Sequence, residues 1–450
     1  MQEDGRRMTR QTESKPAPVP PAQQAREIPQ EWEWVNPCVW TIRMLTALIK
    51  GVKGQKWFRL IDKVFSERNL RIAYGQVAKN GGAAGVDHVT TVQFGQRLRE
   101  NLQKLSEQLR TGDYRPQAVR RVYIPKPGSN EQRPLGIPTV RDRVVQAAIV
   151  NVMEPIFERD FAPHSYGFRP GRGCKDALRR VQELRRQGYV HVVDADLKGY
   201  FDSIPHAGLM KRLGEKLADG SLLRLIQSFL EAKIMDEAAE WTPEAGAPQG
   251  AVLSPLLSNI YLNPLDHLMA ESGYEMVRYA DDFVILCRTP DEAQQALQLV
   301  QAWVEDNGLT LHPTKTRIVD SRETAFAFLG YELKGNTRQP REKSMAKLTD
   351  AIRQLTKRGS GDSLAYIVSK LNPMLRGWMA YFQHSRPPWP FERIDRLIRV
   401  RIRNILRKRS GWKGRANGVD NRRWPNRFFV ELGLYNLQAA HAQAVQSCHR

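Results

Sequence analysis

The sequence predicts an α+β protein in which an antiparallel sheet backed by helices is followed by an α-helical domain. Short apolar runs typical of buried strands alternate with longer segments of helical periodicity over the first three quarters of the chain. After about residue 340 only helical periodicity continues, and basic residues become concentrated. Strands, hairpins and helices in this order are what a helix-backed sheet followed by a helical domain requires.

The first third of the chain is predicted to be mainly helical around one hairpin. Residues 1–30 are rich in Pro and Gln, a composition typical of disorder. A basic strand, a Pro-Gly-Ser-Asn turn and a returning strand through Arg133 predict a hairpin over 118–138. The remaining elements of this part are a helical region at 31–75, a glycine-rich turn at 79–87 and a helix at 88–112.

The middle of the chain alternates helices with strands. Valine-rich and aromatic runs predict strands at 189–197, on both sides of the pair Asp281 and Asp282, and within GLTLHPTKTRIV and AFAFLGYEL. Apolar periodicity predicts helices at 140–158, 174–187, 205–218, 220–230, 252–271 and 290–307.

The last quarter has the pattern of a bundle of three helices. Apolar residues recur every three or four positions between Leu364 and Phe382, and again between Ile394 and Ile405. The arginines of the second segment lie mostly off its apolar stripe. The chain is therefore divided into a disordered tail with an N-terminal helix (1–50), an N-terminal extension (51–117), the sheet-containing part (118–340), the helical domain (341–410) and a basic nucleic-acid-binding segment (411–450).

The charge of the chain indicates a polyanionic partner. The net charge is +21, and residues 341–450, with 23 basic and 7 acidic side chains, carry +16 of it. Such a balance favours nucleic acid or an anionic membrane surface. No apolar run reaches the roughly 20 residues of a membrane-spanning helix, and the N-terminus lacks the apolar core of a signal peptide. We therefore expect nucleic acid as the partner, no membrane, and a cytoplasmic, nucleoid-associated location.

Two adjacent carboxylates interrupt a pair of apolar strands in EMVRYADDFVILC, residues 275–287. Buried charges are costly unless an opposite charge lies beside them. A third carboxylate, Asp196, lies in the strand of VVDADLKGYFDSI, and pairing of the two segments would bring Asp196 and Asp281 to one point. Carboxylates around one point make a hard-oxygen site for Mg²⁺, and two such ions can clamp an in-line phosphoryl displacement. Asp196, Asp281 and Asp282 are therefore predicted as catalytic metal ligands; solvated turn residues are the alternative.

Many blocks in the same order resemble the reverse transcriptases encoded by bacterial group II introns. YADD (279–282) matches the catalytic tetrad of that family. LNPMLRGWMAYF resembles its maturase-specific segment, which also serves as the polymerase thumb, and NRRWPNRFFVELGLYNL resembles the ending of the class C subgroup. The other matching blocks are NGGAAGVD, IPKPGSNEQRPLGIP, SYGFRPGRGCKDAL, DADLKGYFDSI, GAPQGAVLSPLLSNIYLNPLD, GLTLHPTKT and FLGYEL. The resemblance covers roughly residues 55–435.

The resemblance implies a right-hand polymerase, with fingers and palm over 118–340 and a thumb/maturase domain over 341–410. Its implied function is RNA-directed DNA synthesis with two Mg²⁺ ions, or Mn²⁺ in their place, together with maturase activity in splicing and mobility. The implied partners are group II intron RNA, an RNA template with a DNA primer, dNTPs and target DNA. No endonuclease-like His and Cys cluster precedes Arg450, so we expect no cutting of target DNA by this chain.

Two other functions stay open. One is a non-catalytic RNA-binding maturase, and the other is a domesticated reverse transcriptase in repair or defence. The intact acidic residues Asp196, Asp281 and Asp282 argue against a decayed polymerase, as do Phe201 and Gln249. Domesticated lineages show fused domains or altered tetrads, and this sequence has neither.

The resemblance also assigns substrate-binding residues. Phe201 would form the floor of the sugar site and exclude a 2′-hydroxyl; an ordinary core aromatic is the alternative. Lys126 and Arg133 would hold the triphosphate, because guanidinium and ammonium groups pair well with phosphate oxygens. The alternative is that these two residues contact the RNA backbone. Gln249 would lie along the nascent base pair. Lys315 would be the general acid for the leaving pyrophosphate, or only a surface lysine.

Predicted nucleic-acid contacts lie mainly in the helical domain. Arg169, in GFRPGR, is expected to position the template or brace the palm. Clustered basic side chains off an apolar stripe favour phosphate contact over a merely solvated helix face. The predicted contacts of the helical domain are Arg376, Arg399, Arg401, Arg403, Arg407, Lys408 and Arg409.

Overall fold

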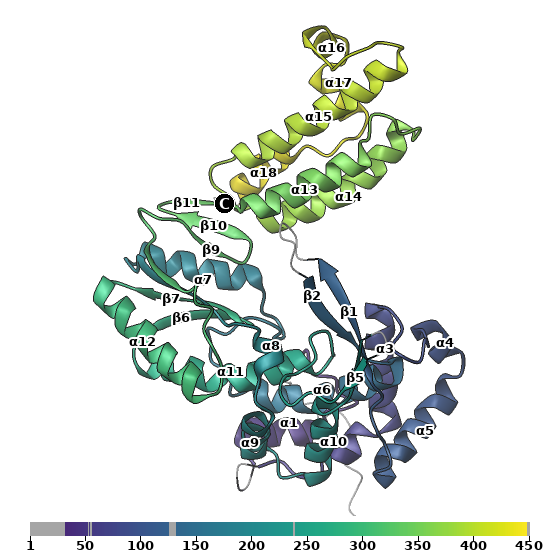
Figure 1. Cartoon of the computed structure of the whole chain (residues 1–450), viewed down its shortest axis with the longest axis vertical. Coiled ribbons are helices and arrows are strands. Elements are labelled where there is room, and N and C mark those ends of the chain that lie inside the picture. Colours follow the sequence, from purple (N-terminus) through teal and green to yellow (C-terminus); the bar gives the residue numbers. More distant parts are fainter. Residues whose placement is uncertain (1–31, 53, 55, 126–131, 237–238, 448–450) are drawn as a thin grey trace, which may run out of the picture.

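The computed structural model describes residues 32–447 apart from 53, 55, 126–131 and 237–238. The predicted disordered tail, residues 1–30, and Lys126 lie outside the described residues. The α+β prediction is confirmed, because sheets with covering helices form the larger part of the chain and a helical domain follows at its C-terminal end (Figure 1).

The N-terminal helices pack against one central helix. α6 (Val140–Glu158) is buried on nearly all sides, and its buried residues include the polar side chains of Asp142, Arg143 and Gln146. α3 (Glu67–Asn80) lies along it, and the side-chain amide of Asn69 donates to the carbonyl of Ala148 over 2.9 Å. The other helices before the first sheet are α1 (Ile42–Lys50), α2 (Ile61–Val64), α4 (Thr91–Gln96) and α5 (Leu98–Thr111).

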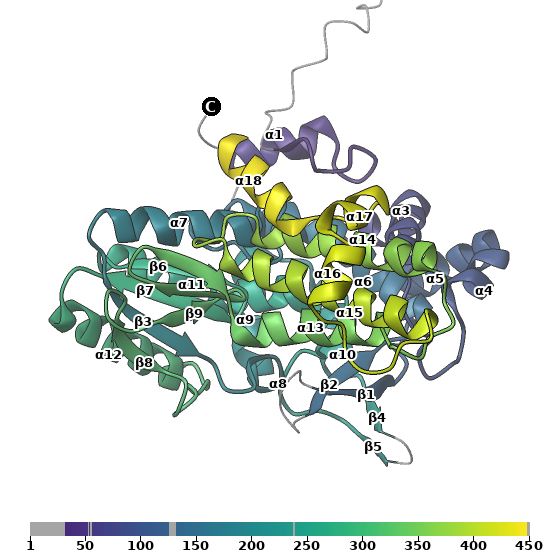
Figure 2. The same ribbon diagram turned by 90° about the horizontal axis from the view of Figure 1, so that it is seen from above.

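The central sheet has the strand order β6-β7-β3-β8, with every neighbouring pair antiparallel. One face, which includes Val193 and Phe283, belongs to the same core as helix α12. The other face, which includes Val192 and Val284, shares a core with α7 (Figures 1 and 2). Burial on both faces explains the continuous apolar run after Asp282. The bounds are β3 (His191–Asp196), β6 (Glu275–Tyr279), β7 (Asp282–Cys287), β8 (Arg317–Asp320), α7 (Cys174–Arg186) and α12 (Pro290–Asp306).

A second sheet, of order β2-β1-β4-β5, joins segments that are distant in the sequence. β1 (Val119–Pro125) and β2 (Gln132–Ile137) form the predicted hairpin. β4 (Ile234–Asp236) runs parallel to β1, and β5 (Ala239–Trp241) pairs with β4. The sequence does not predict β4 and β5, because three-residue strands are too short to show an alternating pattern.

The segment AFAFLGYEL, expected as a strand, forms two strands of a third sheet. β9 (Phe326–Phe328) and β10 (Tyr331–Lys334) are separated by Leu329 and Gly330, whose φ values of 47° and 78° turn the chain back. β11 (Thr337–Pro340) completes this sheet. The expected strand GLTLHPTKTRIV is a strand only in β8, and its first part is a loop beside β3.

The helical domain, residues 341–410, has three helices, the number that periodicity predicts, and three further helices lie in the described part of the segment that follows it. The helical domain lies at the end of the molecule opposite to α5 and α10 (Figure 1). No helix in the described ranges is both long and apolar enough to cross a membrane. The helices of the helical domain are α13 (Glu342–Leu355), α14 (Leu364–Phe382) and α15 (Trp389–Arg409), and those of the segment after it are α16 (Gly418–Arg423), α17 (Asn426–Glu431) and α18 (Leu437–Ser447). The sheet-containing part has four more helices, α8 (Tyr200–Ser203), α9 (His206–Lys216), α10 (Gly220–Leu230) and α11 (Ser254–Glu271).

Candidate active site

Three carboxylates meet at one end of the central sheet. β3 pairs with β7 in a register that makes Asp196 and Asp282 direct cross-strand partners. Partners of this kind have Cβ atoms roughly 4.5–5.5 Å apart. β6 and β7 are joined by the two residues Ala280 and Asp281, which lie between the paired Tyr279 and Asp282. The predicted pairing of the two acidic segments is therefore confirmed.

The turn that carries Asp281 has an unusual backbone. Ala280 has a φ of 60° at the first central position of this two-residue turn, a place that type II′ hairpins normally give to glycine. A non-glycine residue in this region costs about 1–3 kcal/mol and persists only where its surroundings fix it. Gly167 presses against the turn, since a Cβ atom there would lie 2.3 Å from the amide nitrogen of Ala280. We call residues 279–282 the carboxylate turn.

A buried arginine holds the carboxylate turn from behind. The side chain of Arg278 is fully buried, and its Nε donates to Asp266 Oδ1 over 2.7 Å while Nη2 donates to Oδ2 of the same carboxylate. Nη1 donates to the carbonyl of Ala280 over 2.8 Å and to Asn259 Oδ1 over 3.0 Å. The amide of Asn259 in turn donates to the carbonyl of Gly167 over 2.8 Å. The side chain of Arg278 therefore links β6, α11 and the carboxylate turn, and through Asn259 it is connected to the loop of Gly167.

The pKa values of the acidic side chains show how crowded their charges are. Burial, followed by the charges of Asp194, Asp281 and Asp196, raises the pKa of Asp282 to about 7. The pKa of Asp281 is also raised, by burial and by Asp196, while Arg133 and Arg278 oppose the shift. Burial likewise raises the pKa of Asp194. Each carboxylate favours its neighbours' protonated form, so a bound cation would relieve the repulsion.

The donor set fits a divalent cation. The side-chain oxygens of Asp196, Asp281 and Asp282 are carboxylate oxygens, which are the hard ligands that Mg²⁺ prefers. Within the described ranges no three His, Cys, Asp or Glu side chains are gathered closely enough to enclose an ion by themselves. Mg²⁺ sites with one or two carboxylates are completed by water and substrate phosphates. The arrangement therefore suits a site that is complete only with substrate.

Lys315 is brought to the carboxylates, as its predicted role requires. Its Nζ lies 2.8 Å from Asp196 Oδ2, and both side chains are partly open to solvent. The loop before it is fixed along β3, because the amide of His312 donates to the carbonyl of Asp196 and that of Lys198 to the carbonyl of Thr310. Lys315 thus balances part of the acidic charge at the mouth of the site.

The other predicted substrate residues lie around the same end of the sheet. The carbonyl of Phe201, in α8, accepts a 2.7 Å hydrogen bond from the amide of Ala247. The carbonyl of Gln249 accepts one of 2.7 Å from the amide of Gly136 in β2. The loop of Gln249 thus connects α8 to the hairpin. Arg133 is exposed on β2 and lowers the pKa of Asp281 electrostatically.

Arg169 does not face nucleic acid, so its predicted contact there is wrong. Its guanidinium is buried and makes a double hydrogen bond to Glu158 at the end of α6, with Nη2–Oε1 at 2.8 Å. Nη1 donates to the carbonyls of Ala162 (2.6 Å) and Ser165 (2.7 Å). These hydrogen bonds fix the loop that carries Gly167.

Three arginines of α15 are likewise committed to the fold, which corrects their predicted role. Arg403 is buried and donates to the carbonyl of Trp424 over 2.9 Å. Arg401 donates to the carbonyl of Thr356 over 2.9 Å. Arg407 pairs with the buried Asp420 over 2.8 Å. These side chains hold α15 to α13 and to α16, so they offer little to phosphate.

The remaining predicted contacts of the helical domain keep accessible side chains. Arg376, Lys408 and Arg409 are exposed, and Arg399 is half-buried. Arg376 lies over the ring of Tyr435, 5.5 Å from its centroid. Arg409 also donates to the carbonyl of Asp362. Their contact with nucleic acid remains a prediction.

Asp194 is a member of the acidic group that the predicted ligand set leaves out. It precedes Asp196 by two residues, so both lie on the same face of β3. Arg317 Nε lies 3.4 Å from its Oδ2, which gives it a partner of its own. The two-residue spacing in VVDAD is the signal that indicates its proximity.

Comparison with known proteins identifies two regions of the chain. The family profile described as reverse transcriptase (RNA-dependent DNA polymerase) matches residues 124–333, and that described as group II intron, maturase-specific domain matches residues 345–424. Protein YkfC of Escherichia coli (strain K12) is 35% identical over 295 residues, which cover 57% of this chain and 77% of YkfC.

Two further relatives are encoded in introns, according to their descriptions. Group II intron-encoded protein LtrA of Lactococcus lactis subsp. cremoris is 38% identical over 202 residues, which cover 44% of this chain and 33% of LtrA. The uncharacterized 91 kDa protein in the cob intron of Schizosaccharomyces pombe is 30% identical over 328 residues, which cover 60% of this chain and 40% of that protein. The chain thus spans most of YkfC but less than half of these two proteins.

Replacing Arg278 should destabilise the protein strongly. Arg278→Met leaves Asp266 as an unpaired buried charge, which costs about 3–5 kcal/mol. Arg353→Met is the matched control, because both side chains of its pair with Asp350 are exposed and such pairs are worth at most about 1 kcal/mol. Chemical denaturation of both variants measures the difference. Equal, small losses would show that Arg278 does not hold the turn.

Mg²⁺ should raise the melting temperature of the wild type more than that of Asp281→Asn. A cation that binds only the folded state adds about 2.7 kcal/mol of stability at 100 times its Kd. Asp281→Asn removes both a ligand and part of the repulsion, so the free variant should melt higher and gain less from the ion. Thermal melts at constant ionic strength test this, and equal shifts would place the cation elsewhere.

Proposed function

The chain belongs to the family of group II intron-encoded reverse transcriptases with a maturase domain, and on this premise we propose that its DNA synthesis takes place at the carboxylate turn. As a member of this family it is an RNA-directed DNA polymerase. The observation that carries the proposal is the β3–β7 register, which pairs Asp196 with Asp282 and leaves Asp281 in the adjoining turn.

Asp196 and Asp281 are the proposed ligands of two Mg²⁺ ions, with Asp282 supporting them and Mn²⁺ as the alternative metal. When bound, such ions activate a primer 3′-hydroxyl and stabilise the departing pyrophosphate. Burial, together with the neighbouring carboxylates, raises the pKa of Asp282 to about 7, and this supports the assignment. Asp281 reaches the site because Arg278 fixes the backbone of the turn at Ala280.

The residues around the carboxylates bind and orient the nucleotide in this proposal. Arg133, which belongs to the hairpin, binds the triphosphate. Lys126, in the same hairpin segment, is also predicted to bind it. Phe201 lies under the sugar and excludes a 2′-hydroxyl, which selects dNTPs. Gln249 contacts the nascent base pair. Lys315, 2.8 Å from Asp196, donates a proton to the leaving pyrophosphate.

The maturase part of the function is proposed for the helical domain. The maturase-specific profile covers α13 to α16, and exposed basic side chains there suit an RNA backbone. The proposed contacts are Arg376, Arg399, Lys408 and Arg409. The proposed partners are the group II intron RNA, an RNA template with a DNA primer, dNTPs and target DNA. The proposed location is the cytoplasm, in association with the nucleoid.

The proposed domain boundaries follow the fold. Fingers and palm extend over 118–340, up to the end of β11, and the thumb/maturase domain begins with α13 and extends to 410. Residues 51–117 form the extension of the fingers, and residues 411–450 form the basic segment.

Asp281→Ala should abolish DNA synthesis and leave RNA binding nearly unchanged, because it removes a metal ligand and no phosphate contact. The measurement is extension of a DNA primer on an RNA template with dNTPs and Mg²⁺. Asp291→Ala, an exposed aspartate in the first turn of α12, is the control and should extend the primer like the wild type.

Each outcome of this experiment decides between functions. Extension by the wild type and the control alone supports the proposal. Extension by Asp281→Ala would remove the metal assignment. Absence of extension by all three proteins, with tight RNA binding, would favour the non-catalytic maturase.

A further inference from the structure

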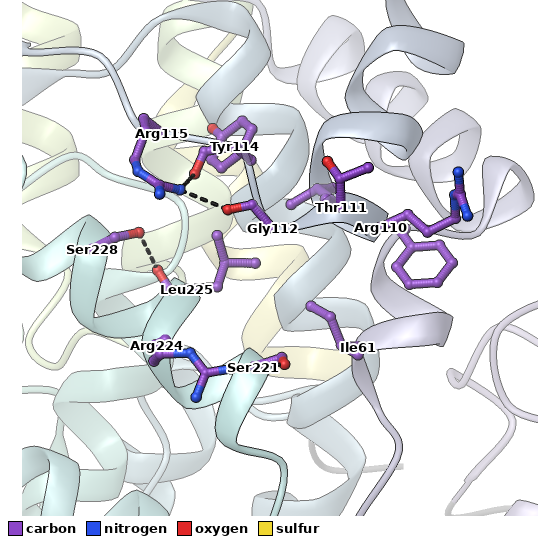
Figure 3. A pocket seen from close by; sticks show the side chains of 12 residues that line it. Ile61, Arg110, Thr111, Gly112, Tyr114, Arg115, Ser221, Arg224, Leu225 and Ser228 are labelled. Atoms are coloured by element: carbon purple, nitrogen blue, oxygen red, sulfur yellow. Dashed lines mark hydrogen bonds between the residues drawn. The ribbon is translucent and has the colours of Figure 1, made fainter.

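A hollow of about 380 Å³ lies away from the carboxylates, between the end of α5 and the first turns of α10. Its volume falls in the range of small-molecule sites, which begins at roughly 300 Å³. Figure 3 shows the guanidinium groups of Arg115 and Arg224 at one side of it and Arg110 at the other. We call this hollow the α5–α10 pocket.

The floor of the α5–α10 pocket is apolar. Leu109, Tyr114 and Leu225 line it and are all buried. The hydroxyl of Tyr114 donates to Asp142 over 2.5 Å, so its polar end is committed to the fold. Phe65 adds an aromatic side chain to the wall. A flat apolar ligand would gain contact with this floor without leaving a buried donor unpaired.

The rim of the pocket carries two positive charges without acidic partners. Arg115 Nη1 donates to the carbonyls of Gly112 (2.7 Å) and Tyr114 (2.8 Å), and Arg224 Nη2 donates to Ser221 Oγ over 3.1 Å. In the described part of the chain no carboxylate oxygen lies within ion-pair distance of either guanidinium. Both groups are exposed. Their neutral acceptors orient them and leave their charges available for an anion.

Two carboxylates near the pocket, Asp219 and Glu107, are used elsewhere. Asp219, at the start of α10, accepts hydrogen bonds from the amides of Leu60, Ile61, Ser221 and Leu222. Glu107 pairs with Arg110 over 2.7 Å. Arg110 therefore lines the same pocket with a charge that is already compensated.

We propose that the α5–α10 pocket binds a single unstacked nucleotide of RNA, with the base on the apolar floor and a phosphate between Arg115 and Arg224. An apolar floor combined with guanidinium groups is the pairing that single-stranded nucleic acid uses. A duplex is excluded, because a hollow of this size admits no helix. The hydroxyl groups of Ser221 and Ser228 supply hydrogen-bonding partners at the edge.

The position of the pocket favours the intron RNA over the template. α5 and α10 lie at the end of the molecule remote from the helical domain (Figure 1). An RNA held at both ends must extend along the whole molecule, as a long folded RNA does. This inference rests on the proposed maturase function and gives it a second anchoring point.

The test compares Arg115→Gln/Arg224→Gln with Arg110→Gln, using a fluorescent single-stranded RNA of about 20 nucleotides and a hairpin RNA of equal charge. At about 0.15 M salt the double variant should bind the single strand at least tenfold more weakly. Its slope of log affinity against log salt should fall by about 0.7, the value for the one phosphate contact that is lost. Arg110→Gln should bind like the wild type.

A second measurement locates the RNA. Single strands that contain 4-thiouridine should photocross-link to the peptide around Phe65 or residues 109–115, and the double variant should lose this cross-link. Equal affinity of the double variant and Arg110→Gln, or an equal loss for the hairpin, would overturn the proposal. Loss of binding to an acidic peptide or to anionic vesicles, with RNA binding intact, would also overturn it. A wild type without polymerase activity would remove the proposed catalysis and leave this binding result standing.

Discussion

The buried ion pair between Arg278 and Asp266 is the interaction on which the proposed active site depends. Its side chains are 0% and 4% exposed, and such a pair is tolerable only when its hydrogen bonds are nearly all satisfied. Here they are satisfied by the backbone of the carboxylate turn and by Asn259. The main chain of Arg278 adds hydrogen bonds to His164 and Tyr166. Three separate segments of the chain, the β6–β7 hairpin, α11 and the loop of residues 164–166, therefore meet at this one residue.

This arrangement separates support from chemistry. The positively charged group that stabilises the turn is buried behind it, while the carboxylates lie at the open end of the sheet. The turn forces Ala280 into a strained backbone conformation with a φ of 60°. Gly167, which has no side chain, leaves room for the turn to pack against it. The acidic groups themselves repel one another, which destabilises the metal-free fold. Functional sites commonly break local rules in this way and are supported by the surrounding structure.

Much of this could be predicted from the sequence. The alternating pattern of β3 and the apolar runs around Asp281 and Asp282 are sufficient to predict one sheet with its carboxylates together. The hairpin of Arg133 follows from its turn residues. Family resemblance supplies the roles of Phe201 and Gln249, which periodicity alone does not indicate.

The failed predictions share a physical cause. A charge count does not show whether an arginine points outward, and a guanidinium with five donors serves equally well to join backbone carbonyls inside the fold. Arg169, Arg401 and Arg403 do this, and Arg407 binds a buried aspartate. The short strand β4 depends on pairing with β1, which lies more than 100 residues away in the sequence, and β5 in turn pairs with β4. Local patterns contain neither kind of information.

The most direct test of the account is to locate the metal. Fe²⁺ binds oxygen sites of this kind, and with ascorbate and peroxide it cleaves the chain close to the bound ion. A metal site shared by the two acidic strands predicts cleavage at two places, within residues 194–196 and within 280–282, with both cuts lost in Asp281→Asn. Cleavage at only one of these segments, or elsewhere in the chain, would show that the two acidic strands do not share one metal site.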